Sequence, residues 1–166
     1  MSNQPAVTGE ASLASQEIIQ LVSFELEGEE YGIDVLAVRE IIRMPGITKM
    51  PNTPEYVDGI INLRGTVVPI ISLRRRFGLY EREGDRNSRI LVMEVGDNLT
   101  GFVVDAVAEV IRISSDEIQP APSIVQGNAA QECITGVLNK AERLLIMLDL
   151  NRLFSDEEKA AFETLE

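Results

Sequence analysis

The feature that most constrains the fold of this chain is an internal repeat. Residues 32–42 align with residues 101–111 and match at six of eleven positions. Five further residues recur in the same order: Gly59, Asn62, Leu73, Arg75 and Phe77 align with Gly136, Asn139, Leu150, Arg152 and Phe154. The offset between the copies grows from 69 to 77, which places about eight additional residues in the loop around 126–132 of the second copy. The repeat predicts that one structural unit occurs twice.

Short β-strands dominate the expected secondary structure of both copies. Alternating apolar and polar residues at 21–26 and β-branched runs elsewhere are typical of strands. Each copy holds about five short strands, which bury a core only if they close into a small barrel. Two barrels sharing an apolar seam would satisfy this requirement. We therefore expect a tandem all-β fold with strands at 18–26, 31–42, 60–63, 66–71, 89–95, 99–113, 134–138 and 143–148.

Several segments are expected to be helical. Residues 35–42 leave a helical alternative open, but a strand is favoured because the run is short, β-branched and bounded by turns. Residues 53–57 resemble one helical turn, and residues 73–77 a short helix closed by Gly78. Ser155 and Glu158 have the spacing of a capping box, which predicts a short acidic helix over 155–166.

Composition excludes many kinds of chemistry. The chain has no histidine and a single cysteine, Cys133. It therefore lacks an imidazole base, a His-ligated metal and a cysteine cluster, and we expect no catalytic residue, no cofactor and no metal. The net charge of −12 argues against a nucleic-acid partner. The first residues lack the basic and apolar segments of a signal peptide, and no apolar run is long enough to span a bilayer, so a cytoplasmic location is expected.

Three motifs are similar to those of one known family. They are the segments Glu29–Asp34, Asn52–Pro54 and above all Gly59–Ile70, which contains Asn-Leu-Arg-Gly followed by Pro-Ile. Together they resemble the chemotaxis coupling proteins of the CheW family, from about residue 17 to residue 154. The resemblance implies two five-stranded SH3-like β-barrels in tandem on a shared hydrophobic core. We accordingly expect a disordered leader at 1–16 and a domain at 17–154 made of two interleaved subdomains, approximately 17–88 and 89–154.

The resemblance also implies a function. Such proteins are non-catalytic adaptors that couple transmembrane chemoreceptors to the histidine kinase CheA. The implied partners are the regulatory domain of the kinase and the cytoplasmic hairpin tip of the receptors. Membrane association would then be indirect, at receptor clusters on the inner face of the membrane.

The family motifs carry candidate receptor-binding residues. Val38 and Glu40 match the receptor-contact strand of the family, and Arg64 matches the arginine of the Asn-Leu-Arg-Gly motif. Gly59 and Gly101 match glycines implicated in coupling. Arg89 is a departure, because some members place an apolar residue beside the groove there. The implied receptor-binding set is thus Val38, Glu40, Gly59, Arg64, Arg89 and Gly101.

Alternatives to these interpretations remain open at the level of sequence. The chain could serve an allied chemosensory system with a non-flagellar output, or be a small ligand-binding β-barrel. The basic run Arg74–Arg76 is interpreted as a solvated helix face rather than a nucleic-acid or membrane patch. Asp34 and Asp105 are expected to satisfy backbone amides at strand bends. Cys133 is expected to be a buried or incidental thiol.

Overall fold

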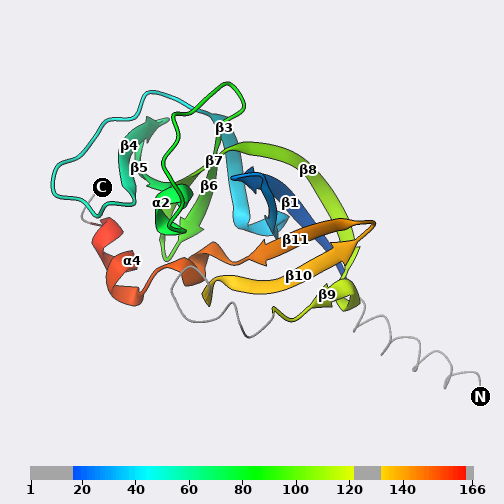
Figure 1. The fold of residues 1–166 in the computed structure, drawn as a ribbon. Coiled ribbons are helices and arrows are strands. Elements are labelled where there is room, and N and C mark those ends of the chain that lie inside the picture. Colours follow the sequence, from blue (N-terminus) through cyan, green and yellow to red (C-terminus); the bar gives the residue numbers. More distant parts are fainter. Residues whose placement is uncertain (1–16, 122–131, 164–166) are drawn as a thin grey trace, which may run out of the picture.

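The computed structural model describes residues 17–121 and 132–163, and these form an all-β molecule with short helices (Figure 1). The leader at 1–16 and the loop at 126–131 lie outside the described residues. The strands are β1 (Ile18–Leu26), β2 (Glu29–Asp34), β3 (Val38–Arg43), β4 (Val57–Leu63), β5 (Thr66–Ser72), β6 (Arg89–Val95), β7 (Asn98–Val104), β8 (Ala106–Ser114), β9 (Ile118–Gln119), β10 (Ile134–Lys140) and β11 (Arg143–Leu148). The helical segments are η1 (Val35–Ala37), α2 (Leu73–Arg76), η2 (Ser115–Glu117), η4 (Leu150–Leu153) and α4 (Asp156–Glu163).

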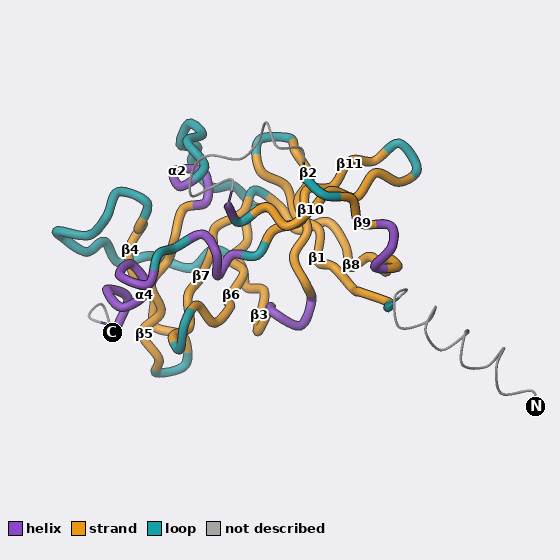
Figure 2. Tube along the Cα trace, turned by 90° about the horizontal axis from the view of Figure 1, so that it is seen from below, coloured by secondary structure: helices purple, strands orange, loops and turns teal. Residues whose placement is uncertain are grey.

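The strands form two sheets that lie side by side (Figures 1 and 2). The five-stranded sheet has the order β3-β6-β7-β5-β4, and we call it barrel 1. The six-stranded sheet has the order β8-β1-β2-β11-β10-β9, and we call it barrel 2. If each strand of one copy is replaced by its equivalent in the other copy, the strand order of barrel 1 becomes that of barrel 2, apart from the two-residue strand β9. The repeat found in the sequence is therefore a repeat of sheet topology.

Each copy of the repeat exchanges its first hairpin with the other copy. The β6–β7 hairpin of the second copy lies between β3 and β5 of the first, and the β1–β2 hairpin of the first lies between β8 and β11 of the second. Parallel pairing marks both junctions, with Gly101 opposite Ile70 and Gly32 opposite Met147. The strand pairing thus differs from the expected division near residue 88, because β6 and β7 (Arg89–Val104) belong to barrel 1.

Both barrels close in the same way. The backbone of Thr48, beyond the end of β3, exchanges hydrogen bonds of 2.9 and 2.8 Å with Ile60 of β4. In barrel 2 the corresponding connection is β9, which follows β8 and pairs with β10. Closure pairs the edge strands, whose free backbone groups would otherwise be exposed.

The core consists of three apolar clusters. One lies inside barrel 1, around Ile70 and Ile90, and another inside barrel 2, around Leu21 and Leu145. The largest cluster contains Phe24 and other residues of both sheets and fills the seam between the barrels. Successive residues of a strand point to opposite faces, so an apolar run such as Ile90–Met93 fills barrel 1 with alternate side chains and the seam with the others.

Some of the local secondary-structure predictions are confirmed, and others differ from the structure. The helix at 73–76 and the capping box of Ser155 with Glu158 are confirmed, the latter by hydrogen bonds of 2.9 and 3.1 Å. Residues 35–42 divide into η1 and β3, and the single strand expected at 99–113 is interrupted at Asp105. Residues 53–57 form a turn without a helix, in which the amide of Val57 donates to Pro54.

The exchange of hairpins makes a prediction about the isolated halves. A fragment of residues 17–88 lacks the β6–β7 hairpin, so both barrel 1 and the seam would expose apolar surface to water. We expect this fragment to show no cooperative thermal transition by circular dichroism. Co-expression with residues 89–166 should restore a one-to-one complex that melts cooperatively. Cooperative melting of the isolated half would contradict the shared core.

Candidate functional site

Glu40 and Arg64 meet on the surface of barrel 1. Glu40 lies on β3, and Arg64 lies in the turn between β4 and β5. The turn needs left-handed backbone at Arg64 and Gly65, where φ is 51° and 90°, and the side-chain oxygen of Asn62 accepts a hydrogen bond of 2.8 Å from the Gly65 amide. This geometry directs the guanidinium across the barrel edge, where both of its Nη groups donate to the Glu40 carboxylate, one of them at 2.9 Å.

The pair is bidentate and open to solvent. The side chain of Arg64 is 69% exposed and that of Glu40 is 31% exposed. The hydrogen bond from Arg64 lowers the pKa of the Glu40 carboxyl, and the same bond raises the pKa of Arg64. Both groups are therefore charged at neutral pH, and a planar guanidinium fork remains accessible to a partner carboxylate.

Val38 lies on β3, two residues before Glu40, and the residue that pairs with it lines a hollow. Val38 is half-buried against the seam cluster, opposite Met93 of β6. Met93 also lines a hollow of about 460 Å³ that is shared by η1, β6 and the strands of barrel 2. Leu36 of η1 lines the same hollow with 88% of its surface exposed. An exposed leucine beside an apolar hollow is a feature of protein-binding surfaces.

The two candidate glycines are buried and serve packing. A Cβ atom on Gly59, whose φ is 149°, would lie 2.2 Å from the Thr48 carbonyl oxygen at the barrel closure. A Cβ atom on Gly101 would lie 2.7 Å from side-chain carbons of Ile70 and Ile90. Neither glycine is accessible to a partner, so a substitution at either position acts on the barrel first.

Arg89 lies away from the other candidates. It is the first residue of β6 and pairs with Arg43, at the opposite end of β3 from Val38. Its Nη1 donates hydrogen bonds of 2.8 Å to the carbonyls of Arg86 and Ser88, which hold it against its own loop. The structure thus brings Glu40 and Arg64 into contact, places Val38 on the same strand but half-buried against the seam, and places Arg89, Gly59 and Gly101 elsewhere.

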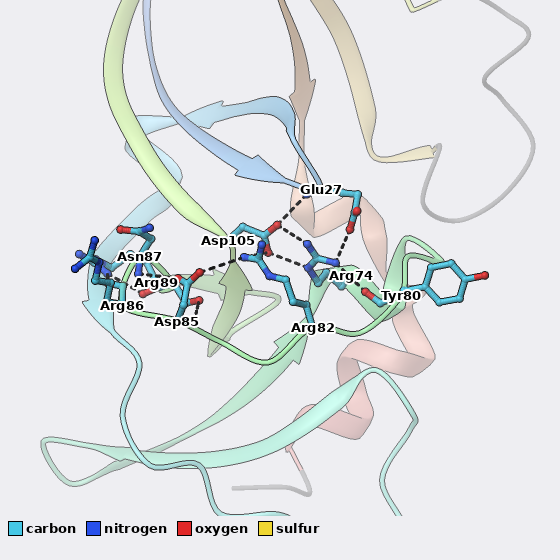
Figure 3. Close-up of polar contacts among 10 residues, drawn as sticks. Glu27, Arg74, Tyr80, Arg82, Asp85, Arg86, Asn87, Arg89 and Asp105 are labelled. Atoms are coloured by element: carbon cyan, nitrogen blue, oxygen red, sulfur yellow. Dashed lines mark hydrogen bonds and ion pairs between the residues drawn. The ribbon is translucent and has the colours of Figure 1, made fainter.

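A buried ion network at the junction of the barrels was missed by the sequence analysis. Arg74 of α2 donates to Asp105 at 2.9 and 2.6 Å, to Glu27 at 2.6 Å and to the carbonyl of Tyr80 at 2.8 Å (Figure 3). Glu27 belongs to the β1–β2 turn and Asp105 separates β7 from β8, so the network joins both barrels. Arg74 is only 8% exposed, and its assignment to a solvated helix face is therefore wrong. The sequence does contain one indication of this network, because the charged residue Asp105 lies within an otherwise apolar run.

Asp105 is held in its ionised form. Burial raises the pKa of this carboxyl, but hydrogen bonds from Arg74 and from the Glu27 amide, together with the charges of Arg74 and Arg82, lower it to a net value below the ordinary one. The 2.8 Å bond from the Glu27 amide agrees with the predicted role of Asp105 at a strand bend. Asp34 has the same role and accepts a bond of 2.9 Å from the Leu36 amide.

The C-terminal helix is fixed to barrel 1 by Arg76. Its guanidinium lies 4.6 Å from the ring centre of Tyr56 and 5.2 Å from that of Phe154. It also donates to Glu158 of α4 at 3.1 and 3.0 Å, and Tyr56 donates to the same carboxylate at 3.0 Å. Burial and the neighbouring Glu158 raise the pKa of Tyr56 to about 12. This end of the molecule is therefore a closed structural contact.

Reactive groups are few in the described residues. Cys133 is buried, as expected, and burial raises the pKa of its thiol to about 12, so the reactive thiolate is scarce at neutral pH. The described segments contain no group of three acidic or cysteine side chains placed to hold a metal ion. No helix within them is long and apolar enough to cross a membrane.

Comparison with known proteins decides the family. The model of the CheW-like domain matches residues 20–158. The chain belongs to the CheW family. It is 38% identical to the chemotaxis protein CheW of Klebsiella aerogenes over 156 residues, which cover 93% of each chain. It is also 38% identical to the chemotaxis protein CheW of Treponema pallidum over 148 residues, covering 87% of this chain and 86% of the relative.

A solved CheW structure agrees with this assignment. The crystal structure of the scaffolding protein CheW from Thermoanaerobacter tengcongensis superposes with a TM-score of 0.77 at 36% identity, covering 86% of this chain and 91% of the other. Chemotaxis relatives and a scaffolding structure together support the function of a chemotaxis coupling adaptor. The CheW family is one of scaffolds and adaptors rather than of enzymes.

The ion network at the barrel junction makes a prediction about pH. The pKa of Asp105 is lower in the folded state than in the unfolded chain, so its ionised form stabilises the fold above about pH 4. That contribution is lost as the pH falls through the folded-state value. We expect Asp105→Asn to lower the free energy of unfolding at pH 7 by about 2–3 kcal/mol in urea titrations.

The same titrations at pH 3 should show a much smaller difference between the variant and the natural chain. Asp97→Asn, at an exposed turn between β6 and β7, is the matched control and should change stability little at either pH. An equal loss at pH 7 and pH 3 would mean that the Asp105 charge is not what stabilises the junction.

Proposed function

We propose that this CheW-family adaptor couples transmembrane chemoreceptors to the chemotaxis histidine kinase CheA. It holds the cytoplasmic hairpin tip of a receptor on one surface and the regulatory domain of the kinase on another. The chain then lies in the cytoplasm at receptor clusters on the inner face of the membrane, and reaches the membrane only through the receptors. Because both contacts form at once, a movement of the receptor tip is transmitted to the kinase.

The receptor is assigned to the surface that contains Val38, Glu40 and Arg64. The observation that carries this assignment is the exposed bidentate ion pair. The hollow at Leu36 lies at η1, which directly precedes β3 in the chain. A receptor hairpin presents helices with apolar and charged positions, which suit a helix-in-groove contact. Its apolar side chains fit the hollow, and a carboxylate fits the guanidinium of Arg64.

Gly59, Gly101 and Arg89 have indirect roles in this proposal. The two glycines keep barrel 1 in the form that presents Glu40 and Arg64. Arg89 is held by its own loop at the far end of β3, and the receptor contact does not need it. The kinase contact is assigned to a barrel edge away from the Glu40–Arg64 pair.

Replacing Arg64 should separate the two binding activities. Arg64→Ala should weaken binding of a receptor hairpin fragment by about 10- to 100-fold, as for the loss of an arginine hot spot. Binding of the kinase regulatory domain should change by less than about threefold, under 0.7 kcal/mol. Both affinities can be measured by isothermal titration calorimetry with fragments from the bacterium that encodes this chain.

Arg39→Ala provides the matched control. Arg39 also lies on β3, is exposed and pairs with a surface glutamate, Glu94. Its partner is Glu94 of β6 rather than Glu40, so its loss should leave receptor binding unchanged. Equal weakening of both partners by Arg64→Ala, or a melting temperature lower by about 10 °C or more, would make Arg64 a structural residue.

A charge-reversed pair tests what Arg64 contacts. The double variant Glu40→Arg with Arg64→Glu keeps an ion pair within the protein but places a carboxylate where the receptor needs a cation. We expect this variant to bind the receptor no better than Arg64→Ala. Recovery of natural affinity would show that the pair only shapes the groove and makes no contact with a receptor carboxylate.

A further inference from the structure

The repeat relates the hollow at Leu36 to a second, larger pocket. Adding the repeat offset of 69 converts Ile19, Asp34 and Leu36 of the first hollow into Ser88, Val103 and Asp105 of the second. Subtracting the offset of 77 converts Thr135 and Asp149 into Asp58 and Ser72. The second pocket has a volume of about 510 Å³ and lies at one end of barrel 1. It is the counterpart of the first hollow, with a different chemistry.

Two apolar positions of the first hollow are polar in the pocket of barrel 1. Ser88 takes the place of Ile19, and Asp105 takes the place of the exposed Leu36. The loop that follows α2 adds Glu81, Arg82 and Gly84 to the wall. Mouths of small β-barrels that combine an apolar wall with a few polar groups are common ligand sites, and the volume lies in the usual range of about 300–1,000 Å³.

Asp58 is directed into this pocket by a β-bulge. Val57 pairs with Ile71 and Gly59 pairs with Ile70, so Asp58 is the additional residue between two paired positions. Barrel 2 has a bulge at the equivalent Thr135, between Ile134 and Gly136. A bulge turns a side chain out of the regular alternation of the strand and often lies next to a functional site.

The carboxylate of Asp58 has no hydrogen-bond donor among the described residues. Its side chain is 21% exposed, and Arg75 is 3.6 Å away. The N–H groups of Arg75 are directed elsewhere: Nε donates to Glu81 at 3.0 Å, Nη2 to the same carboxylate, and Nη1 to the carbonyl of Glu55 at 2.7 Å. Burial is the main reason that the pKa of Asp58 is raised. A charged group in this situation is stabilised by a ligand that donates hydrogen bonds.

The other buried charges of the pocket are balanced internally. Arg74 is saturated by Asp105, Glu27 and a carbonyl, and Arg82 lies 3.5 Å from Asp105 (Figure 3). Asp58, which has an ion pair with Arg75 at 3.6 Å but accepts no hydrogen bond from the described residues, is therefore the half-buried acceptor left for a ligand. The lining also includes the apolar residues Met44, Ile47, Met50, Val57 and Val103, which suit an aliphatic group. Flexible methionine side chains adapt to ligands of different shape.

We propose that this pocket binds a small organic cation with an aliphatic stem, and that Asp58 is its counter-ion. The ammonium or guanidinium group donates to the Asp58 carboxylate, while the stem packs on the apolar residues of the lining. The site is separate from the Glu40–Arg64 surface, and its occupancy does not depend on receptor or kinase binding. Its failure would leave the adaptor function untouched.

The test uses hexylammonium as a probe and hexan-1-ol as its neutral counterpart, in ¹H–¹⁵N correlation spectra of the full chain at pH 7. Hexylammonium should shift the amide signals of residues around 44–58, 72–75 and 82–88, and saturate. Hexan-1-ol should bind at least about tenfold more weakly, because it makes no charge-assisted hydrogen bond to Asp58. Equal binding of the two probes, or shifts elsewhere only, would overturn the proposal.

Variants identify the counter-ion. Asp58→Asn keeps the shape of the side chain and should weaken hexylammonium binding by about tenfold, whereas the exposed Asp97→Asn should not. Lys49→Ala removes a competing cation that faces Asp58 and should strengthen binding, which gives an independent result even if Asp58→Asn folds poorly. Unchanged affinity in the folded Asp58→Asn variant, or no gain for Lys49→Ala, would contradict the assignment.

A blocked lysine distinguishes a free molecule from a partner side chain. Nα-acetyl-lysine N-methylamide presents the same cation from a peptide backbone. The pocket extends beyond what one side chain fills, so we expect free hexylammonium to bind at least as tightly as the blocked lysine. Much tighter binding of the blocked lysine would point to a protein partner and overturn the small-molecule proposal.

Discussion

The apolar seam between the barrels is the constraint on which the rest of the structure depends. Neither barrel is complete without a hairpin from the other copy of the repeat, and the largest core cluster contains residues of both sheets. A buried leucine, isoleucine or phenylalanine contributes about 1.5–3 kcal/mol, so this seam is a principal source of stability. The two barrels therefore form one folding unit, and their relative position is fixed by packing rather than by a linker.

That fixed position gives the adaptor its surfaces. The chain crosses between barrels at η1 and again at Asp105, and each crossing borders a hollow. At the first crossing the hollow contains the exposed Leu36, just before the strand that carries Glu40. At the second, the Arg74–Asp105 network holds the junction, and the pocket contains Asp58, which accepts no hydrogen bond from the described residues. The two crossings are related by the repeat but carry different side chains, so the two surfaces differ in chemistry.

The proposed mechanism needs no reactive group. The described residues offer a buried thiol with a raised pKa and carboxylates, several of which are paired with arginines. Function then depends on holding two partners at fixed spacing, and a rigid double barrel suits this role. In the proposed receptor contact, Arg64 is the main charged group, and the remaining surface provides shape.

The sequence by itself determined the repeat, the strands, the turns and the family. These features depend on local patterns: alternation gives strands, and Asn-Leu-Arg-Gly gives the turn that presents Arg64. Only the tertiary structure decided which strands pair, because apolar runs buried on both faces, such as Ile90–Met93, fit either barrel equally well. It also decided that Gly59 and Gly101 are buried, that Arg89 lies apart and that Arg74 is an internal residue. Each of these outcomes depends on contacts between segments far apart in the chain, and no local pattern encodes the partner of a buried charge.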